Sequence, residues 1–513
     1  MNSSQSRAEA IAIKDDRIVK VGTNEEITQC IGKNTRVISL KGRTVVPGLI
    51  DTHAHVADFG RLARIDLRRL KSVEEMKSRI REGVQKAPEG KWVLGQGWDQ
   101  TNFSEKGYPN LSDLDEASPH NPIVLYHKFE RTCILNSKAL ELSGITKETK
   151  SPPGGIIDKD METGELTGIL RENATDLVWK IIPEPSEEDI MEATTLACEK
   201  IVKAGVTSVH WMVSSPIEIQ IIQRMRKENK LPLRIYIIIP VNLMGNATGL
   251  DSGKDFGDNL VRIGGVQIFA DGSLAARTAA LFQPYSDDSS TIGRQLCTQE
   301  TMNALAIKIC KANLQLVIHA MGDRGVDAAL TAIEKTSTEA ALGKNNRPRI
   351  EHASLLNKEL IQRIKKLEVV LSMQPPSIIS EFSVWSAADR LGPERARWLF
   401  PLKTLINEGI MVSGGSDCPM EPISPLAGIQ AAVAREFFPE ERITVDEALR
   451  IYTVNAAYSS FEEGIKGSIE EGKLADLTVI SRDPLTVPPS EIEDIQVEMT
   501  IVGGRVIYPK SFS

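Results

Sequence analysis

The 513-residue sequence predicts an α/β fold, a (β/α)8 TIM barrel with a small β-sandwich domain built from both termini. Apolar strands alternate with helical segments through the middle of the chain, whereas short β-patterns gather at its two ends. We predict that the apolar run 44–52, which ends in His53-Ala54-His55, is a buried parallel strand. Side chains at i and i+2 of a strand project the same way, so the two imidazoles can share one divalent metal. Such barrels keep their active sites at these strand ends.

Seven further strands are expected, because helical segments separate the apolar runs and predict parallel βαβ units. Together with the His53 strand they make eight, the number that closes a (β/α)8 barrel. The seven segments are Val206–Met212, Arg234–Pro240, Gly265–Ala270, Leu316–Ala320, Arg349–His352, Val369–Met373 and Met411–Ser413.

The two ends of the chain predict one composite β-domain, residues 1–48 with 466–513, and leave the barrel to 49–465. A hairpin around Asp15-Asp16 opens the chain, and Gly503-Gly504 joins the last two strands. The expected strands are Ala10–Lys14, Arg17–Gly22, Leu474–Ile480, Glu498–Val502 and Arg505–Tyr508.

About 150 residues separate the first two barrel strands, where a simple crossover needs only a few dozen. This insertion, about 57–200, has its own strand patterns at 92–95 and 122–126 and turn residues at 152–155. A loop that leaves the C-terminal end of a barrel strand lies at the active-site mouth. We therefore expect a lid that shapes the substrate pocket.

The composition is that of a soluble globular protein, with 41% hydrophobic and 25% charged residues. A net charge of −8 without a basic block argues against a nucleic-acid or anionic-membrane partner. No run approaches 18 apolar residues, and the N-terminus lacks a signal-peptide core. Six dispersed cysteines are typical of reduced thiols, so we expect a cytoplasmic protein. Cys418 should point away from its neighbour Asp417 and is not expected to be a ligand.

Three later strands also end in polar side chains: His319 on the fifth, His352 on the sixth and Asp417 on the eighth. With His53 and His55 they form a predicted metal site of four imidazoles and one carboxylate. That set suits Zn²⁺, with Mn²⁺ or Fe²⁺ also possible.

The predicted reaction is metal-assisted hydrolysis. Asp417 is the expected proton shuttle, and His352 is expected to stabilise the oxyanion of the intermediate. The three remaining histidines lack this placement and are expected to be structural, although His210 could line the pocket: they are His120, His127 and His210.

At these residues the chain resembles the amidohydrolase superfamily, specifically the family-3 branch that contains N-substituted formamide deformylases. The resemblance covers nearly the whole chain and implies hydrolysis of a non-peptide C–N bond. It implies ligand roles for the five residues above. It also implies substrate contacts from six residues that lie in the family motifs or at positions where this chain differs from the family: Trp98, Asp99, Arg131, Gln267, Asp271 and Arg277. The motifs that carry it are residues 46–55, 97–99, 136–140, 153–155, 269–273, 277–280, 318–324, 349–352, 415–419 and 467–476.

Three departures from this family are informative. The family usually has a metal-bridging carbamylated lysine where this chain has Gln267, which predicts one metal per chain. Glu130-Arg131 replaces a usual Gly-His pair, which alters the charge of the pocket. Family members also begin with another β-strand ahead of Ala8. We therefore expect a β-domain one strand short, or a misassigned start, with a free edge near Ala10–Ile13 that allows a homodimer.

Three functions remain open from the sequence. The first is an amidohydrolase that cleaves a small amide or formamide. The second is a mononuclear deaminase of a cyclic amidine, which Gln267 favours because some superfamily deaminases present a glutamine there. The third is a non-catalytic binding protein, which Gln267 and Arg131 motivate and the five intact ligands oppose.

Overall fold

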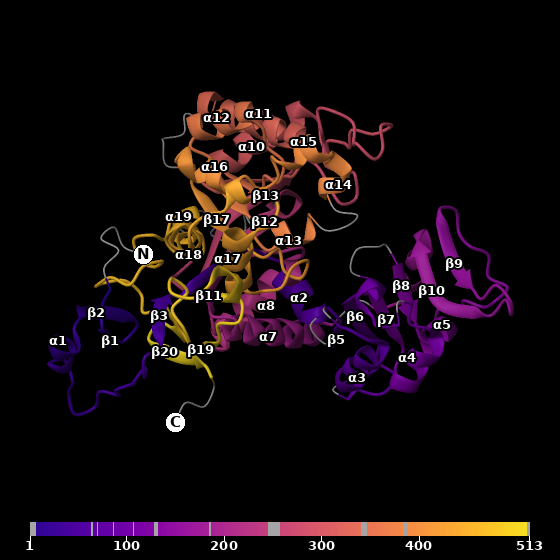
Figure 1. The fold of residues 1–513 in the computed structure, drawn as a ribbon, viewed down its shortest axis with the longest axis horizontal. Coiled ribbons are helices and arrows are strands. Elements are labelled where there is room, and N and C mark those ends of the chain that lie inside the picture. Colours follow the sequence, from indigo (N-terminus) through magenta and orange to yellow (C-terminus); the bar gives the residue numbers. More distant parts are fainter. Residues whose placement is uncertain are drawn as a thin grey trace. The chain divides into compact units, whose positions relative to one another are not determined.

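The computed structural model describes residues 7–509 except for 63–64, 69, 86, 106, 128–131, 184–185, 245–256, 340–345 and 383–386. It divides into two compact units (Figure 1). The first comprises residues 1–56 and 198–513, and the second comprises residues 57–197.

The first unit contains a parallel eight-stranded barrel, which confirms the predicted fold class. Each strand pairs with the next in chain order, and a bridge between Ala54 and Cys418 links the first strand end to the last. The seven strands after the first match their predicted segments to within four residues at either end. They are β4 (Leu49–Ala54), β11 (Val206–Met212), β12 (Arg234–Pro240), β13 (Val261–Phe269), β14 (Gln315–Ala320), β15 (Arg349–His352), β16 (Val370–Met373) and β17 (Val412–Gly414).

Helices separate most of these strands, as expected for parallel strands joined by crossovers; between β12 and β13 the described residues form only a short 3-10 helix at Val241–Leu243. Helix α12 shows how the sequence specifies them. The Asn357 side chain caps its first turn, Leu360, Ile361 and Ile364 are buried, and basic residues occupy its last turn. The helices are α7 (Glu187–Lys203), α8 (Pro216–Lys227), α10 (Gln299–Lys311), α11 (Asp323–Glu339), α12 (Lys358–Lys366), α13 (Ser377–Ser380), α14 (Ala387–Leu391), α15 (Pro393–Ala396), α16 (Leu402–Asn407), α17 (Pro425–Ala434), α18 (Val445–Ile451) and α19 (Val454–Ser459).

The run 44–52 is not one strand, and here the prediction was wrong. It divides at Gly48 into β3 (Thr44–Pro47), which pairs antiparallel with β18 (Leu477–Ile480), and the barrel strand β4. A Cβ on Gly48 would lie 2.2 Å from the Thr207 hydroxyl oxygen, so only glycine lets the chain pass from one sheet to the other here.

Both ends of the chain contribute to the β-structure beside the barrel (Figure 1). A four-stranded sheet has the order β20-β19-β18-β3, with β19 at Val497–Val502 and β20 at Arg505–Tyr508. The hairpin of β1 (Ala10–Lys14) and β2 (Arg17–Gly22) forms a separate sheet, followed by α1 (Asn24–Thr28).

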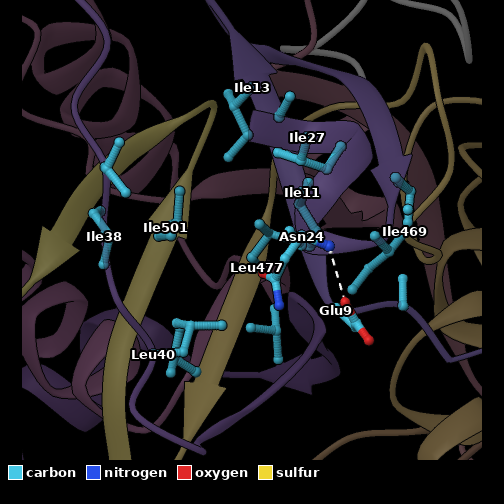
Figure 2. Close-up of a pocket in the computed structure, with 18 of the residues that line it drawn as sticks. Glu9, Ile11, Ile13, Asn24, Ile27, Ile38, Leu40, Ile469, Leu477 and Ile501 are labelled. Atoms are coloured by element: carbon cyan, nitrogen blue, oxygen red, sulfur yellow. Dashed lines mark hydrogen bonds between the residues drawn. The ribbon is translucent and has the colours of Figure 1, made fainter. Parts of the chain in front are cut away.

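An open hollow lined by both apolar and polar residues lies between the hairpin and the four-stranded sheet (Figure 2). Ile11 and Ile27 line it from the hairpin side, and Leu477 and Ile501 line it from the sheet. Its volume is about 2520 Å³, far above the roughly 300–1,000 Å³ of a small-molecule pocket. Among the described residues β1 pairs only with β2, so its outer edge is free.

The second unit is built on a six-stranded mixed sheet of order β5-β6-β7-β8-β10-β9. Its strands alternate between two apolar clusters, with Ile123 and Leu125 in one and Val124 in the other, so both faces of the sheet are covered. The predicted strands at 92–95 and 122–126 correspond to β6 and β7. The elements are β5 (Ile65–Asp66), β6 (Val93–Trp98), β7 (Ile123–His127), β8 (Thr132–Leu135), β9 (Gly155–Lys159), β10 (Leu166–Glu172), α3 (Val73–Val84), α4 (Leu111–Ala117), α5 (Ser137–Leu142) and α6 (Asp176–Trp179), with α2 (Val56–Leu62) leading into the unit.

Within the part of the chain that the structure describes, no helix combines the length and the apolar character needed to cross a membrane.

Candidate metal centre

Three of the predicted ligands converge at the C-terminal ends of β4 and β17. The Nε2 atoms of His53 and His55 each lie 3.4 Å from Oδ1 of Asp417. Among the described residues these three form the one group of imidazoles, thiols and carboxylates whose ligand atoms all lie within 4.8 Å of one another. The His53 side chain is 2% exposed, but His55 and Asp417 are 32% and 20% exposed, so the group faces outward on one side.

Backbone hydrogen bonds fix the relative positions of the three side chains. The amide of Asp417 donates to the carbonyl of His53 over 2.8 Å, and the amide of His55 donates to the carbonyl of Cys418 over 2.8 Å. Behind them, buried Asp51 accepts from the amides of His53 and Ser416, each over 3.0 Å. The two strand ends are therefore joined side by side, and the ligands they carry move together.

His352 and His319 lie beside this group. The His352 ring centroid is 4.9 Å from that of His53 and 4.6 Å from that of His319. His352 has a φ of 70° and Asp417 a φ of 55°, both in the sparsely populated left-handed region. Glu351 already points to the barrel interior, so regular alternation would turn His352 outward. The left-handed backbone at His352 brings its ring to the other imidazoles instead.

Two of the three separations between the ligand atoms are those expected around a tetrahedral metal. Ligand atoms about 2.0–2.2 Å from a zinc ion lie about 3.3–3.6 Å from one another in a tetrahedron. The two 3.4 Å separations between imidazole nitrogen and carboxylate oxygen fall in that interval. Two imidazoles and one carboxylate also form one of the donor sets of catalytic zinc sites. The residues present therefore fit a divalent metal.

The charges around His53 favour a cation at its Nε2 atom. Burial alone would lower the pKa of His53, but hydrogen bonds to Asp417 and Glu351 outweigh it and raise the pKa to about 9. Burial would raise the pKa of Asp417, but hydrogen bonds from His53 and His55 hold it well below its usual value. Burial lowers the pKa of His352 to about 4 and that of His319 to about 3, so both rings are neutral.

Two polar residues of this region were missed by sequence reasoning. Glu351 accepts a hydrogen bond from Nδ1 of His53 over 2.6 Å, and Arg349 donates to Glu351 in turn. The sequence did contain an indication of their role, because Arg349 and Glu351 are two residues apart on a buried strand and therefore both face the barrel interior. His210, which was expected to be structural or to line the pocket, is fully buried, and its Nδ1 atom lies 2.8 Å from Nη1 of Arg349.

Gln267 is buried on β13, opposite Val317 of β14. Val317 packs with Tyr236 and Ile238 inside the barrel, so Gln267 faces the same interior. Its side chain is a neutral amide, where a bridging ligand would need an anionic oxygen.

The other predicted substrate contacts are placed differently. Asp271 is buried, and its carboxylate accepts from the amides of Ala280, Met321 and Gly322, each over 2.9 Å. Burial, the larger influence, raises its pKa to about 6. Arg277, with a φ of 54°, forms an ion pair with Asp287 over 2.6 Å. Both side chains thus hold loops together.

In the second unit, Trp98 is fully buried and donates its indole N–H to the carbonyl of Leu125. Asp99 accepts from the side chain of Asn102 over 3.0 Å. Arg131 lies outside the described residues. The substrate roles of these residues stay predictions.

An eight-stranded parallel barrel with imidazoles and a carboxylate at its carboxyl ends defines a metal-dependent hydrolase. The family model described as "Amidohydrolase family" matches residues 36–508, and the chain belongs to this family. It is therefore a metal-dependent hydrolase that acts on carbon–nitrogen bonds.

The chain is 33% identical to the putative amidohydrolase YtcJ of Bacillus subtilis (strain 168) over 98% of its own length and 97% of that protein. It is 29% identical to the N-substituted formamide deformylase of Arthrobacter pascens over 100% of its own length and 97% of the other. Among solved structures, an uncharacterized metal-dependent hydrolase from Pyrococcus furiosus is similar, with a TM-score of 0.75, 32% identity, and coverage of 93% of this chain and 95% of that one.

Gly415 provides a direct test of the ligand geometry. A Cβ at this position would lie 2.6 Å from the backbone nitrogen of His53 and 2.9 Å from its Cβ, so Gly415→Ala must displace His53. We expect Zn²⁺ affinity, measured by competition with a chromogenic chelator, to fall about tenfold or more. Gly464→Ala is the matched control, since nothing lies within 4 Å of its added Cβ. Equal zinc affinities in both variants would contradict the assigned geometry.

Proposed function

We propose that this enzyme cleaves the C–N bond of a small amide or formamide. The observation that carries the proposal is the His53, His55 and Asp417 group, which offers three ligands on one side and is partly exposed on the other. The similarity to a protein named N-substituted formamide deformylase supports the substrate class. A panel of N-substituted formamides, acylamines and cyclic amidines tests it, with release of formate, carboxylate or ammonia as the readout.

We propose one Zn²⁺ per chain as the cofactor, with Mn²⁺ or Fe²⁺ as the alternatives. His53, His55 and Asp417 would hold it, and His319 and His352 stand beside them. When bound, such a metal polarises a water molecule and lowers its pKa from 15.7 towards about 7. Gln267 supports a single ion, because a primary amide cannot form the bridging carbamate that a second ion would share.

In this proposal Asp417 and His352 carry out the proton and oxyanion chemistry. Asp417 has a low pKa and is ionised, so a carboxylate oxygen that is not bound to metal can accept a proton from the attacking water and pass it to the leaving nitrogen. The neutral His352 ring can donate an N–H to the carbonyl oxygen as negative charge develops there. The fixed strand ends keep both groups oriented and exclude bulk water from the His53 side.

A deaminase of a cyclic amidine is the second candidate, and Gln267 favours it. The amide of Gln267 faces the barrel interior and forms no hydrogen bond with the described residues, so it is available to a ring nitrogen of a substrate. Release of ammonia from a cyclic amidine, without release of formate from formamides, would favour this second function.

We expect the protein prepared with excess Zn²⁺ or Mn²⁺ to contain about one ion per chain, measured by elemental analysis after gel filtration. Gln267→Lys in bicarbonate buffer should raise the ratio towards two, because the new amine can take up CO₂. Gln267→Met, which has similar volume but no amine, is the matched control. Two tightly held ions in the parent protein would contradict the prediction.

Asp417→Asn should lower turnover by about 10²–10⁴, since an amide keeps the shape of the side chain but cannot accept a proton. Metal content and the circular dichroism spectrum, measured on the same sample, separate lost chemistry from lost metal or fold. Asp327→Asn, which removes a surface ion pair with Arg363, is the control and should retain parental activity. Turnover within tenfold of the parent in Asp417→Asn would rule out the assigned role.

We also propose that two copies associate through the outer edge of β1, which pairs with no strand among the described residues. Ile13 on this strand is 36% exposed, and unpaired strand edges pair readily with one another. Ile13→Lys should shift the molar mass from light scattering towards the monomer. Val19→Lys on β2, which is 45% exposed, should change it less. A monomeric parent protein would exclude this association.

A further inference from the structure

Glu351 lies directly behind the candidate metal site. Its Oε2 atom is 2.6 Å from Nδ1 of His53, and the two side chains are 0% and 2% exposed. The opposite ring nitrogen of His53, Nε2, faces Asp417 at 3.4 Å. The His53 ring is thus held between two carboxylates, one on the ligand side and one on the side away from it.

A neutral imidazole has one N–H group and one lone pair, and an ionised carboxylate can only accept a hydrogen bond. In the neutral form of His53, the one that can bind a metal, the contact with Glu351 therefore places the proton on Nδ1 and leaves the lone pair on Nε2. We propose that Glu351 is a positioning residue that fixes the tautomer and orientation of His53 for metal binding. The proposal rests on the proposed function only through the divalent metal and is independent of the substrate.

Arg349 keeps the Glu351 carboxylate ionised and in place. Its guanidinium donates to both carboxylate oxygens of Glu351, and it also donates to the carbonyl of Thr52 and, over 3.1 Å, to the hydroxyl of Ser372. Because Arg349 is fully buried, its planar group has no room to turn towards solvent. Glu351 therefore cannot rotate away from His53 without breaking this arrangement.

His210 contacts the guanidinium of Arg349 at its Nη1 atom. Its Nδ1 atom lies 2.8 Å from Nη1 of Arg349, and it must accept because a guanidinium has no lone pair. One continuous chain of hydrogen bonds then runs from His210 through Arg349 and Glu351 to His53. A buried ion pair between Arg349 and Glu351 would be complete without His53, so the 2.6 Å contact to Nδ1 is a separate feature that needs its own explanation.

Zinc affinity without substrate is the direct test. We expect Glu351→Gln to raise the Kd for Zn²⁺ by about 10–100-fold, since an amide is a weaker acceptor and can also present an N–H to Nδ1. Glu351→Leu, which has no hydrogen-bond acceptor, should raise the Kd further. Glu462→Gln is the matched control, because Glu462 is equally buried and ion-paired with Lys466 over 2.7 Å. It should lose thermal stability but keep the parental Kd.

The outcomes are distinct. A Kd for Glu351→Gln within threefold of the parent, in a folded protein, overturns the positioning role and leaves the proposed function intact. A parent protein that binds neither Zn²⁺ nor Mn²⁺ overturns both. If the Glu351 variants do not fold, a neutron structure of the zinc-loaded parent decides. Deuterium on Nδ1 of His53, directed at Glu351, supports the proposal, and an unprotonated Nδ1 overturns it.

Discussion

The central constraint in this barrel is the burial of charge around His53. Asp417 and Glu351 approach the two nitrogens of one imidazole, and Arg349 is the buried cation on the Glu351 side. Carboxylates removed from water are stable only when cations or hydrogen-bond donors surround them. Arg349 compensates Glu351, whereas the imidazoles that face Asp417 carry positive charge only when protonated. A bound cation at Nε2 would meet the same need, so the electrostatics and the ligand geometry favour the same occupant.

The fold holds these side chains in place with little conformational freedom. Parallel strands place their carboxyl ends at one rim, and the reciprocal backbone bonds between His53, His55 and residues 417–418 lock the first strand end to the last. Local strain completes the site, because the left-handed backbone at His352 and Asp417 turns side chains to positions that a regular strand would not give them. The rigid rim allows the ligand atoms to be preorganised before a metal binds.

The barrel, the terminal strands and the convergence of His53, His55 and Asp417 were predictable from the sequence. An apolar run that ends in a polar residue predicts both a buried strand and the side chain at its C-terminal end, and this prediction does not depend on how the core packs. The sequence did not reveal that the run 44–52 divides at Gly48, because a change of sheet leaves the apolar pattern unbroken. The hairpin of β9 and β10 was also missed, since glycine and charged residues interrupt its short apolar runs and several of its residues are exposed. Glu351 escaped notice because its role depends on a contact with a residue about 300 positions away.

The most direct test of a single metal held by His53, His55 and Asp417 is an anomalous-scattering map from crystals grown with Zn²⁺. The account predicts one peak per chain at about 2.0–2.2 Å from Nε2 of His53, Nε2 of His55 and a carboxylate oxygen of Asp417. Two peaks about 3.5–4 Å apart, as in two-metal sites, or a single peak away from these three side chains, would contradict it.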